Sequence, residues 1–437
     1  MRNESKRLAV TTLGCKVNQY DTDSVVTQFV QAGYSIVDFQ DLADVYLVNT
    51  CTVTNLGDRK SRQMIRRAHK RNPEAKVVVM GCLAQTAPED VSVLDGVSLV
   101  VGTNGRSRIV EEVESLGWGE QRSLVDDILH VSEFEDLPSL DFSGRTRASL
   151  KIQDGCNQFC TYCRVPFARG PSRSRSRDSV LQQVEQIVRL GYKEIVLTGI
   201  HLGLYGADLE PPLTLSQIGR DIADTSGLLR LRLSSVDPHE ITDTLIELLD
   251  EHPVLCRHMH IPLQSGSDRV LERMKRNYTR DQFRGIVEKL RQRIPEIALT
   301  TDIMVGFPGE SEEDFVQTMD LAEEVGFAKI HVFPYSKRAG TRAALFSEQI
   351  PISVKEERSR RLIQLGECLA EKFHRSHLDR TVHVLVEQLQ DGQAIGHTDN
   401  YLKVTFPLPS AVDLVGEIVP VQVSQIRTDG VLGQLST

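Results

Sequence analysis

The sequence predicts an α/β protein in three parts: an N-terminal doubly wound parallel sheet, a central partial (β/α)6 barrel and a C-terminal small all-β barrel. Short β-branched runs alternate with helical patterns up to about residue 118, and the alternation returns six times between Ala148 and Phe333. From Val382 onward only short strand-like runs and tight turns remain. Alternating strands and helices are typical of parallel sheets, whereas short strands with tight turns are typical of small closed barrels.

The bulk composition is that of a globular chain with two or three domains: 437 residues, 40% hydrophobic and 25% charged. No apolar run approaches a membrane span and the first residues lack a signal-peptide core, so we expect a soluble, cytoplasmic protein. The net charge of −9 does not favour nucleic-acid binding. However, seven Lys or Arg crowd one predicted helix, Asp58–Arg71, and basic patches on an acidic protein can still neutralise phosphates.

Three cysteines in the N-terminal part follow three consecutive predicted strands. Cys15 and Cys82 each come directly after a glycine, and Cys51 follows the second strand. Because ligand sites of open α/β sheets lie at the carboxyl ends of strands, we expect the three thiols to meet and form an iron–sulfur site. The alternative is that some of them are merely buried thiols. The predicted strands are Leu8–Leu13, Val45–Val48, Val77–Met80 and Leu99–Val101, and the helices are Ser24–Ala32, Asp58–Arg71 and Arg106–Leu116.

Residues 119–145 lose the strand–helix pattern and mix acidic residues with Pro138, Ser139 and Gly144. This composition predicts an acidic linker. The single tryptophan, Trp118, lies at its boundary, and we expect it to serve packing rather than function.

Three further cysteines, Cys156, Cys160 and Cys163, lie within eight residues of one loop. This spacing is too compact for ordinary packing cysteines and suits one soft metal centre. A structural zinc site wants four protein ligands, and the loop offers no fourth Cys or His. Three ligands suit a [4Fe–4S] cluster whose fourth iron is open to a substrate or cofactor. Three unrelated buried cysteines are the less favoured alternative.

The central part has six predicted strands, and polar or glycine-rich residues follow five of them. In α/β barrels the chemistry collects at the carboxyl ends of the strands, so these segments predict the site. The predicted strands are Ala148–Ile152, Glu194–Thr198, Leu229–Leu233, His258–Ile261, Ala298–Ile303 and Lys329–Phe333. The segments after the first five are Asp154–Cys163, Thr198–Gly199, Ser234–Ser235, Gln264–Gly266 and Val305–Glu310.

A long charged helix, Lys355–Leu378, is predicted to bridge to the C-terminal part. Four apolar runs with tight turns between them follow within about 60 residues. They predict a small closed barrel of the kind that holds RNA. The runs are Val382–Val386, Tyr401–Val404, Val415–Val423 and Gly430–Leu435.

These motifs resemble those of a known family. Cys156-x3-Cys160-x2-Cys163, with the aromatic Tyr162 before the last cysteine, resembles the signature of radical S-adenosylmethionine (SAM) enzymes. Gly-Cys15-Lys-Val-Asn, Asn-Thr-Cys51 and Met-Gly-Cys82, together with the β-barrel tail, are similar to the methylthiotransferases, whose tail domain is called TRAM. Within that family, Thr-Leu-Gly-Cys15-Lys-Val-Asn-Gln-Tyr and the motif from Val165 to Arg175 resemble the MtaB branch, which acts on N6-threonylcarbamoyladenosine in tRNA.

The resemblance implies four segments and two cofactors. The segments are 1–118, a methylthiotransferase N-terminal domain; 119–145, the linker; 146–372, the radical SAM core; and 375–437, the TRAM domain. It implies one [4Fe–4S] cluster on Cys156, Cys160 and Cys163, and a second, auxiliary one on Cys15, Cys51 and Cys82. The first would pass an electron to SAM, and the resulting 5′-deoxyadenosyl radical would remove the hydrogen at C2 of adenine. The auxiliary cluster would carry the sulfur, and a second SAM would supply the methyl group.

The resemblance also implies SAM contacts and partners. The implied partners are tRNA and an electron donor such as a flavodoxin-like protein, with no membrane; the oligomeric state stays open. Ser234, Gln264 and Asp302 could equally make ordinary hydrogen bonds or be structural. The implied SAM contacts are Tyr162, Gly199, Ser234, Gln264, Asp302 and Gly306.

Two rival functions remain at this point. One is methylthiolation of isopentenyladenosine in tRNA or of a ribosomal-protein aspartate. The other is a non-catalytic iron–sulfur regulator that binds RNA. His258 and His260 are expected to pack or to form hydrogen bonds rather than bind metal, and Cys256 and Cys368 to be buried like small hydrophobes.

Overall fold

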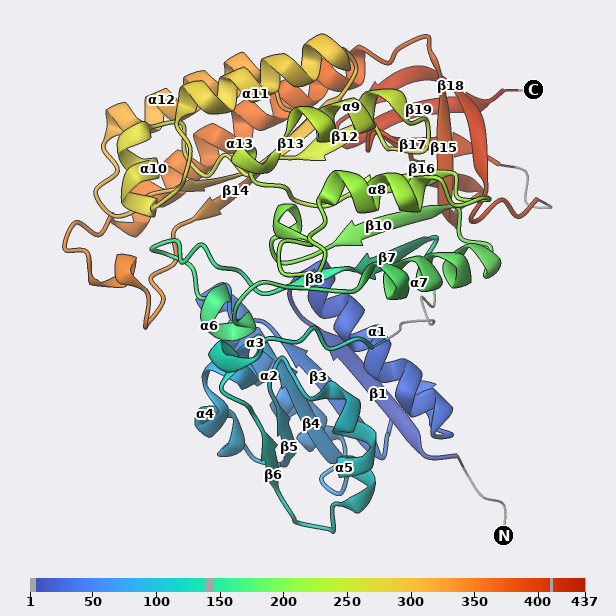
Figure 1. The fold of residues 1–437 in the computed structure, drawn as a ribbon, viewed down its shortest axis with the longest axis vertical. Coiled ribbons are helices and arrows are strands. Elements are labelled where there is room, and N and C mark those ends of the chain that lie inside the picture. The colour runs from blue at the N-terminus through green and yellow to red at the C-terminus, as the bar shows by residue number, and fades with distance from the viewer. Residues whose placement is uncertain (1–4, 138–144, 409–411, 437) are drawn as a thin grey trace. The chain divides into compact units, whose positions relative to one another are not determined.

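The computed structural model describes residues 5–137, 145–408 and 412–436 of the chain. The chain divides into two compact units. Unit 1 comprises residues 1–142, 150–179 and 336–344, and unit 2 comprises residues 143–149, 180–335 and 345–437. Figure 1 follows both along the chain. Pro138, Ser139 and Gly144 of the predicted linker lie outside the described residues.

Unit 1 is built on a parallel six-stranded sheet in the order β2-β1-β3-β4-β5-β6. The predicted doubly wound sheet is therefore confirmed. Its strands are β1 (Arg7–Thr12), β2 (Ser35–Val37), β3 (Val45–Thr50), β4 (Lys76–Gly81), β5 (Val97–Val101) and β6 (Arg122–Leu124), and the hairpin-like pair β8 (Gln153–Asp154) and β9 (Arg173–Ser174) lies in the same unit.

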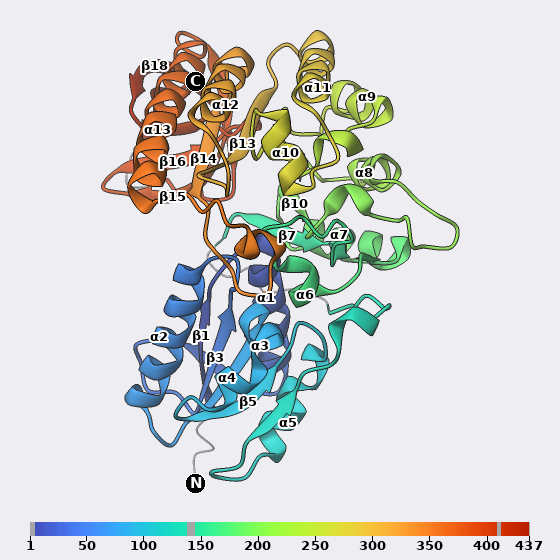
Figure 2. The same cartoon turned by 90° about the vertical axis from the view of Figure 1, so that its left-hand side faces the viewer.

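Helices cover both faces of this sheet. Phe29 of α1 and Val113 of α5 pack with Leu8 and Leu47 in one apolar core, whereas Ile65 of α2 packs in the other. Figure 2 shows α2 and α5 on opposite sides of the strands. The helices are α1 (Lys16–Gln31), α2 (Asn55–Arg71), α3 (Cys82–Thr86), α4 (Pro88–Ser92), α5 (Ile109–Ser115) and α6 (Val165–Arg169), with 3-10 turns at Arg106–Arg108 and Ile128–His130.

The structure corrects three sequence predictions in this unit. The helix predicted from Ser24 begins at Lys16, because its first turns bury polar residues and so lack apolar periodicity. The predicted linker 119–145 contains β6, a three-residue edge strand too short to give a strand pattern. Trp118, expected to pack, is 86% exposed because it lies between Gly117 and Gly119 after α5 has ended.

Unit 2 contains the central parallel strands. They form two three-stranded sheets, β11-β10-β7 and β12-β13-β14, linked by the isolated parallel bridges Leu231–Leu255 and Ser235–His260. The six predicted strands of the partial barrel are thus all present. They are β7 (Arg147–Lys151), β10 (Glu194–Thr198), β11 (Arg230–Leu233), β12 (His258–His260), β13 (Ala298–Val305) and β14 (Lys329–Pro334).

The connecting helices begin at well-formed caps. Thr214, Thr279 and Ser311 each form a reciprocal capping box with the residue three positions later. The helices are α7 (Arg177–Arg189), α8 (Leu215–Ala223), α9 (Asp243–Glu251), α10 (Asp268–Met274), α11 (Arg280–Arg293), α12 (Glu312–Val325) and α13 (Ile352–Arg375), with 3-10 turns at Leu202–Leu204 and Pro238–Glu240 in unit 2 and at Arg342–Leu345. No described helix is long and apolar enough to cross a membrane.

The C-terminal strands close into a barrel in the order β15-β16-β17-β19-β18. The predicted small barrel is confirmed, with one strand more than the apolar runs indicated. That strand, β16, follows the Asp391-Gly392 turn and carries only two buried positions. The strands are β15 (Thr381–Gln390), β16 (Gln393–His397), β17 (Lys403–Pro407), β18 (Ile418–Arg427) and β19 (Gly430–Leu435).

Candidate metal and cofactor site

The three N-terminal cysteines lie at the carboxyl ends of three neighbouring strands. Cys15 caps α1 after β1, Cys51 follows β3, and Cys82 opens α3 after β4. A Cβ atom added to Gly14, which has a φ of +107°, would lie 3.2 Å from the Cys51 sulfur. Glycine is therefore required beside Cys15, both for the backbone conformation and for this close approach. The three cysteines thus lie at one edge of the sheet as expected, and the iron–sulfur site stays a prediction.

Asn18 places a polar side chain beside the same sulfurs. Its Nδ2 donates to the carbonyls of Leu13, at 2.8 Å, and of Thr50, at 3.0 Å. Its Oδ1 consequently faces the sulfurs, lying 3.8 Å from Cys15 Sγ and 3.9 Å from Cys82 Sγ. Sequence analysis included Asn18 in a motif but assigned it no role. The signal for one was its place three residues after Cys15, on the same helical face.

The donor sets fit iron–sulfur clusters better than structural zinc, because each set offers three thiols, whereas a structural zinc site takes four protein ligands. All six thiols are free of disulfides. Burial raises the pKa of the Cys82 thiol to about 12, while the charge and hydrogen bond of Arg169 oppose that rise.

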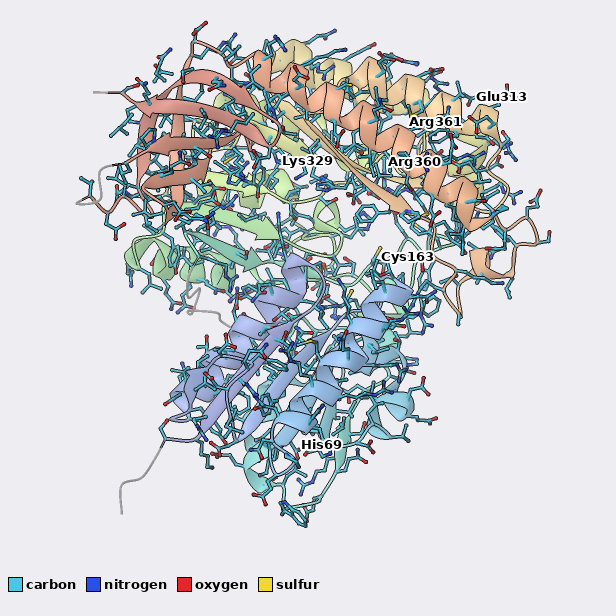
Figure 3. All side chains as sticks on the ribbon, turned by 180° about the vertical axis from the view of Figure 1, so that it is seen from behind. His69, Cys163, Glu313, Lys329, Arg360 and Arg361 are labelled. Atoms are coloured by element: carbon cyan, nitrogen blue, oxygen red, sulfur yellow. The ribbon has the colours of Figure 1, made fainter. Side chains whose placement is uncertain are left out.

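The second cysteine set lies on the loop between β8 and α6, where Figure 3 labels Cys163. Two of its sulfurs accept hydrogen bonds from the backbone. The N–H of Gln158 donates to Cys156 Sγ at 3.5 Å, and the N–H of Val165 donates to Cys163 Sγ at 3.4 Å. Such donors stabilise thiolates, the form that binds iron. Tyr162 is half-buried beside Cys163.

A buried charge network lies in the same unit as both sets of cysteines. Asp21 on α1 accepts from Lys151 Nζ, at 2.6 Å, and from Arg169 Nη1, at 2.7 Å, and pairs with Arg106. Asp154 accepts from the same Lys151, at 2.9 Å, and from Arg169, at 3.2 Å. Burial by itself would raise the pKa of Asp21, but Arg106, Lys151 and Arg169 lower it to about 2. Both carboxylates therefore stay ionised.

In unit 2 the predicted SAM contacts lie at strand ends. Gly199 follows β10, Ser234 follows β11, and Gly306 follows β13. The Ser234 hydroxyl is buried and, among the described residues, has no hydrogen-bond partner. A buried orphan hydroxyl at this edge fits a polar ligand. Gly306 has a φ of +69° and its N–H donates to the Glu310 carboxylate.

The other two predicted contacts lie together beside Gly306. The backbone N–H of Gln264 donates to the carbonyl of Asp302 at 2.8 Å, and Gln264 has a left-handed φ of +59°. Asp302 Oδ2 lies 3.4 Å from Nε2 of His260. His260, Asp302 and His331 have ligand atoms close enough to hold a metal ion. The structure thus gives Asp302 a second possible role beside SAM contact.

The predicted hydrogen bonding of His258 and His260 is confirmed, whereas the prediction that His260 binds no metal stays untested. His258 Nε2 and His260 Nδ1 lie 3.0 and 2.9 Å from the Thr300 hydroxyl. Cys256 is buried as expected, but Cys368 is exposed on α13, so the prediction for Cys368 is wrong. The residue type alone does not predict whether a side chain on a helix is buried or exposed.

The chain matches three protein families: the radical SAM superfamily over residues 150–322, the uncharacterised protein family UPF0004 over residues 7–102, and the TRAM domain over residues 375–435. Two solved structures share the fold. They are the radical S-adenosylmethionine methyltransferase TsrM from Kitasatospora setae (TM-score 0.57, 17% identity, 75% of this chain and 73% of that chain) and the cobalamin-dependent radical enzyme OxsB (TM-score 0.53, 14% identity, 84% and 61%). Together these matches define the class, a radical SAM protein.

Full-length relatives define the family. The chain is 43% identical to the threonylcarbamoyladenosine tRNA methylthiotransferase MtaB of Bacillus subtilis, over 95% of this chain and 93% of that one. It is 37% identical to MtaB of Aquifex aeolicus (91% and 96%) and 33% identical to a tRNA-2-methylthio-N(6)-dimethylallyladenosine synthase of Acetivibrio thermocellus (99% and 91%). The chain belongs to the radical SAM methylthiotransferase family. It is an enzyme of the family whose cofactors are a [4Fe–4S] cluster and SAM.

Proposed function

We propose that this enzyme adds a methylthio group to C2 of N6-threonylcarbamoyladenosine beside the anticodon of tRNA. The observation that carries the proposal is the presence, within one compact unit, of two separate three-cysteine sites. The relatives named for threonylcarbamoyladenosine tRNA, at 43% and 37% identity, support the choice of nucleoside. Since tRNA works in the cytoplasm, the proposal includes a cytoplasmic location.

In this proposal Cys156, Cys160 and Cys163 hold the cluster that binds SAM, and the three N-terminal cysteines hold a second [4Fe–4S] cluster that carries sulfur. When bound, the reduced cluster and SAM supply one-electron chemistry that can break the C–H bond at C2 of adenine, which acid–base catalysis cannot do at neutral pH. A flavodoxin-like protein would supply the electron. The segments 1–118, 146–372 and 375–437 serve as sulfur-site, radical and RNA-binding domains.

The chain's own residues would bind and orient the reactants. We assign the SAM contacts to Tyr162 beside the cluster loop and to Gly199, Ser234, Gln264, Asp302 and Gly306 at the strand ends of unit 2. The orphan hydroxyl of Ser234 is the strongest of these assignments, because a bound ribose or carboxylate would satisfy it. Gly306 has a left-handed φ of +69°, and a Cβ atom there would lie 2.3 Å from Lys355 Cγ, so glycine is required at the end of this strand.

The basic helix α2 supports RNA as the substrate. It begins four residues after Cys51 and carries seven Lys or Arg against one Asp. Arg59, Lys60, Arg66 and Lys70 are exposed along it, and Figure 3 labels His69 in its last turn. A row of exposed cations beside a sulfur site can neutralise backbone phosphates and hold a nucleic acid there.

The test uses anaerobically reconstituted protein, SAM, dithionite and tRNA that carries threonylcarbamoyladenosine, with nucleosides analysed by mass spectrometry. We expect one methylthio group on that nucleoside, abolished by Cys156→Ala and by Cys51→Ala. Cys368→Ala is the matched control, because Cys368 is exposed and lies outside both sets. A parallel reaction uses tRNA that carries isopentenyladenosine. Modification of that tRNA alone would overturn the proposed substrate, and a fully loaded protein that cleaves no SAM would overturn the enzyme mechanism.

A further inference from the structure

Arg169 is the most deeply buried cation beside the sulfur site. It ends α6, six residues after Cys163, and its side chain is 0% exposed. A buried guanidinium is costly unless its donors are used. Here Nη1 donates to Asp21 and Asp154, and Nη2 donates to Asn18 Oδ1 at 2.5 Å. The arginine thus runs from the loop of one cysteine set to the side chain that faces the other set.

The hydrogen bond to Asn18 acts on the sulfurs. Asn18 cannot turn its oxygen away, because its Nδ2 is held by two backbone carbonyls. In the thiol form, Cys15 and Cys82 can donate to Oδ1. Once the sulfurs bind iron they carry no proton, so Oδ1 then faces electron-rich sulfur. The guanidinium of Arg169, which donates to Oδ1 and also interacts with Cys82, offsets this repulsion and brings a positive charge beside the sulfurs.

We propose that Arg169 is a positioning residue for the auxiliary cluster, holding Asn18 against Cys15 and Cys82 and stabilising the cluster's added electron with its charge. This inference rests on the proposed function, since it requires a cluster on Cys15, Cys51 and Cys82. A cation near a cluster favours the reduced state, so loss of Arg169 makes the cluster harder to reduce. Arg169 therefore couples the loop that carries Cys156, Cys160 and Cys163 to the auxiliary cluster through one side chain.

Lys151 provides the matched control. It is as buried as Arg169 and donates to the same two carboxylates, Asp21 and Asp154. Its hydrogen bonds do not go to Asn18. If Arg169 serves only the buried ion network, Lys151→Met and Arg169→Met should have equal effects. If Arg169 acts on the cluster through Asn18, only Arg169→Met should change the cluster.

The experiment isolates the auxiliary cluster in full-length protein in which Cys156, Cys160 and Cys163 are replaced by Ala. Iron content is measured, and the one-electron reduction is titrated with dithionite and followed by electron paramagnetic resonance. For Arg169→Met we expect at least a tenfold fall in the ratio of reduced to oxidised cluster at a fixed potential, which is 59 mV for one electron. Lys151→Met should change that ratio less than threefold, and Arg169→Lys should restore part of it.

Each result either supports or contradicts the proposed role of Arg169. Equal shifts in the two Met variants, or none in either, overturn the role of Arg169. If Arg169→Met does not fold, Arg169→Lys and Asn18→Ala take its place, and a ratio unchanged in both contradicts the inference. A background protein that binds no iron at all would instead overturn the second cluster of the proposed function, and the inference with it. Iron present with unchanged potentials sinks only the inference.

Discussion

The strongest stability prediction concerns Arg232, which joins the central strands of unit 2 to the C-terminal barrel. Its side chain is 1% exposed, and its Nε donates to Glu194 Oε1 at 2.7 Å. Its Nη1 donates to the Asp399 carbonyl at 2.6 Å, and its guanidinium lies 3.9 Å from the Tyr401 ring centroid. Replacement with Met keeps the apolar stem but removes every one of these bonds.

The expected loss is about 4 kcal/mol. Removing one partner of a buried ion pair costs about 3–5 kcal/mol, because the remaining charge stays buried. Glu194 would keep the ion pair with Arg230, at 3.5 Å, and the nearby charge of Arg147. The cation–π interaction, worth up to about 2 kcal/mol, overlaps with this figure rather than adding to it. The turn before β17 would also lose its anchor, and Tyr401 there has a left-handed φ of +65°.

Hydrogen exchange measures the local loss in the folded protein. Peptides that cover 194–198 and 398–404 should exchange about a thousandfold faster in Arg232→Met, as expected for about 4 kcal/mol. Arg220→Met is the control, because Arg220 is 51% exposed and lies 3.8 Å from Glu251, a pair worth well under 1 kcal/mol. The double change Arg232→Met with Glu194→Met should recover most of the loss. A loss below about 1 kcal/mol, or a double variant as weak as the single one, would refute the reasoning.

Three further changes test other parts of the chain. Asp314→Ala removes the acceptor for the Ser311 N–H and hydroxyl at the start of α12, and urea unfolding should show a loss of about 2 kcal/mol; an unchanged midpoint would contradict the capping role. The pKa of Asp21 is lowered to about 2, so its ionised form stabilises the fold above about pH 4 by about 2 kcal/mol, and this stability is lost as pH falls from 4 toward 2. Acid titrations of Asp21→Asn should lack that slope. Neutralising Arg66 and Lys70 on α2 to Gln should weaken tRNA binding at all sequences and reduce the slope of its salt dependence by about one for each phosphate that is no longer neutralised; an unchanged salt slope would exclude that helix from the RNA interface.

Much of the candidate site could be predicted because its cysteines occupy equivalent positions, each directly after a strand of a parallel sheet. Cys15, Cys51 and Cys82 each follow an apolar, β-branched strand, and parallel strands end at one edge of the sheet. The six central strands were predictable for the same reason, since buried parallel strands are continuous apolar runs. The strands that were missed, β2, β6, β8, β9 and β16, are only two to five residues long, too short to give a strand pattern.

The buried charges could not be predicted, because nothing local marks them. Asp21 lies in the first turns of α1, which bury mostly polar residues, so apolar periodicity does not mark that stretch as buried. Its partners Lys151 and Arg169 lie 130 and 148 residues further along the chain. Only the tertiary structure shows that cations remote in the sequence contact Asp21 and offset the free-energy cost of burying its charge. From sequence alone Arg169 is only part of the motif from Val165 to Arg175 that resembles the family, whereas the structure shows that it is completely buried.

This burial itself argues for a role at the metal site. A buried ion network is weak evidence of stability, because well-packed apolar side chains of similar volume often stabilise a fold as well or better. Asp21, Lys151, Asp154 and Arg169 together therefore require an explanation other than stability. A pocket that must hold thiolates needs a wall that carries cations, and the cations need carboxylates to remain buried and fixed. We infer that the carboxylates serve to place Arg169, and that Arg169, through Asn18, serves the sulfurs.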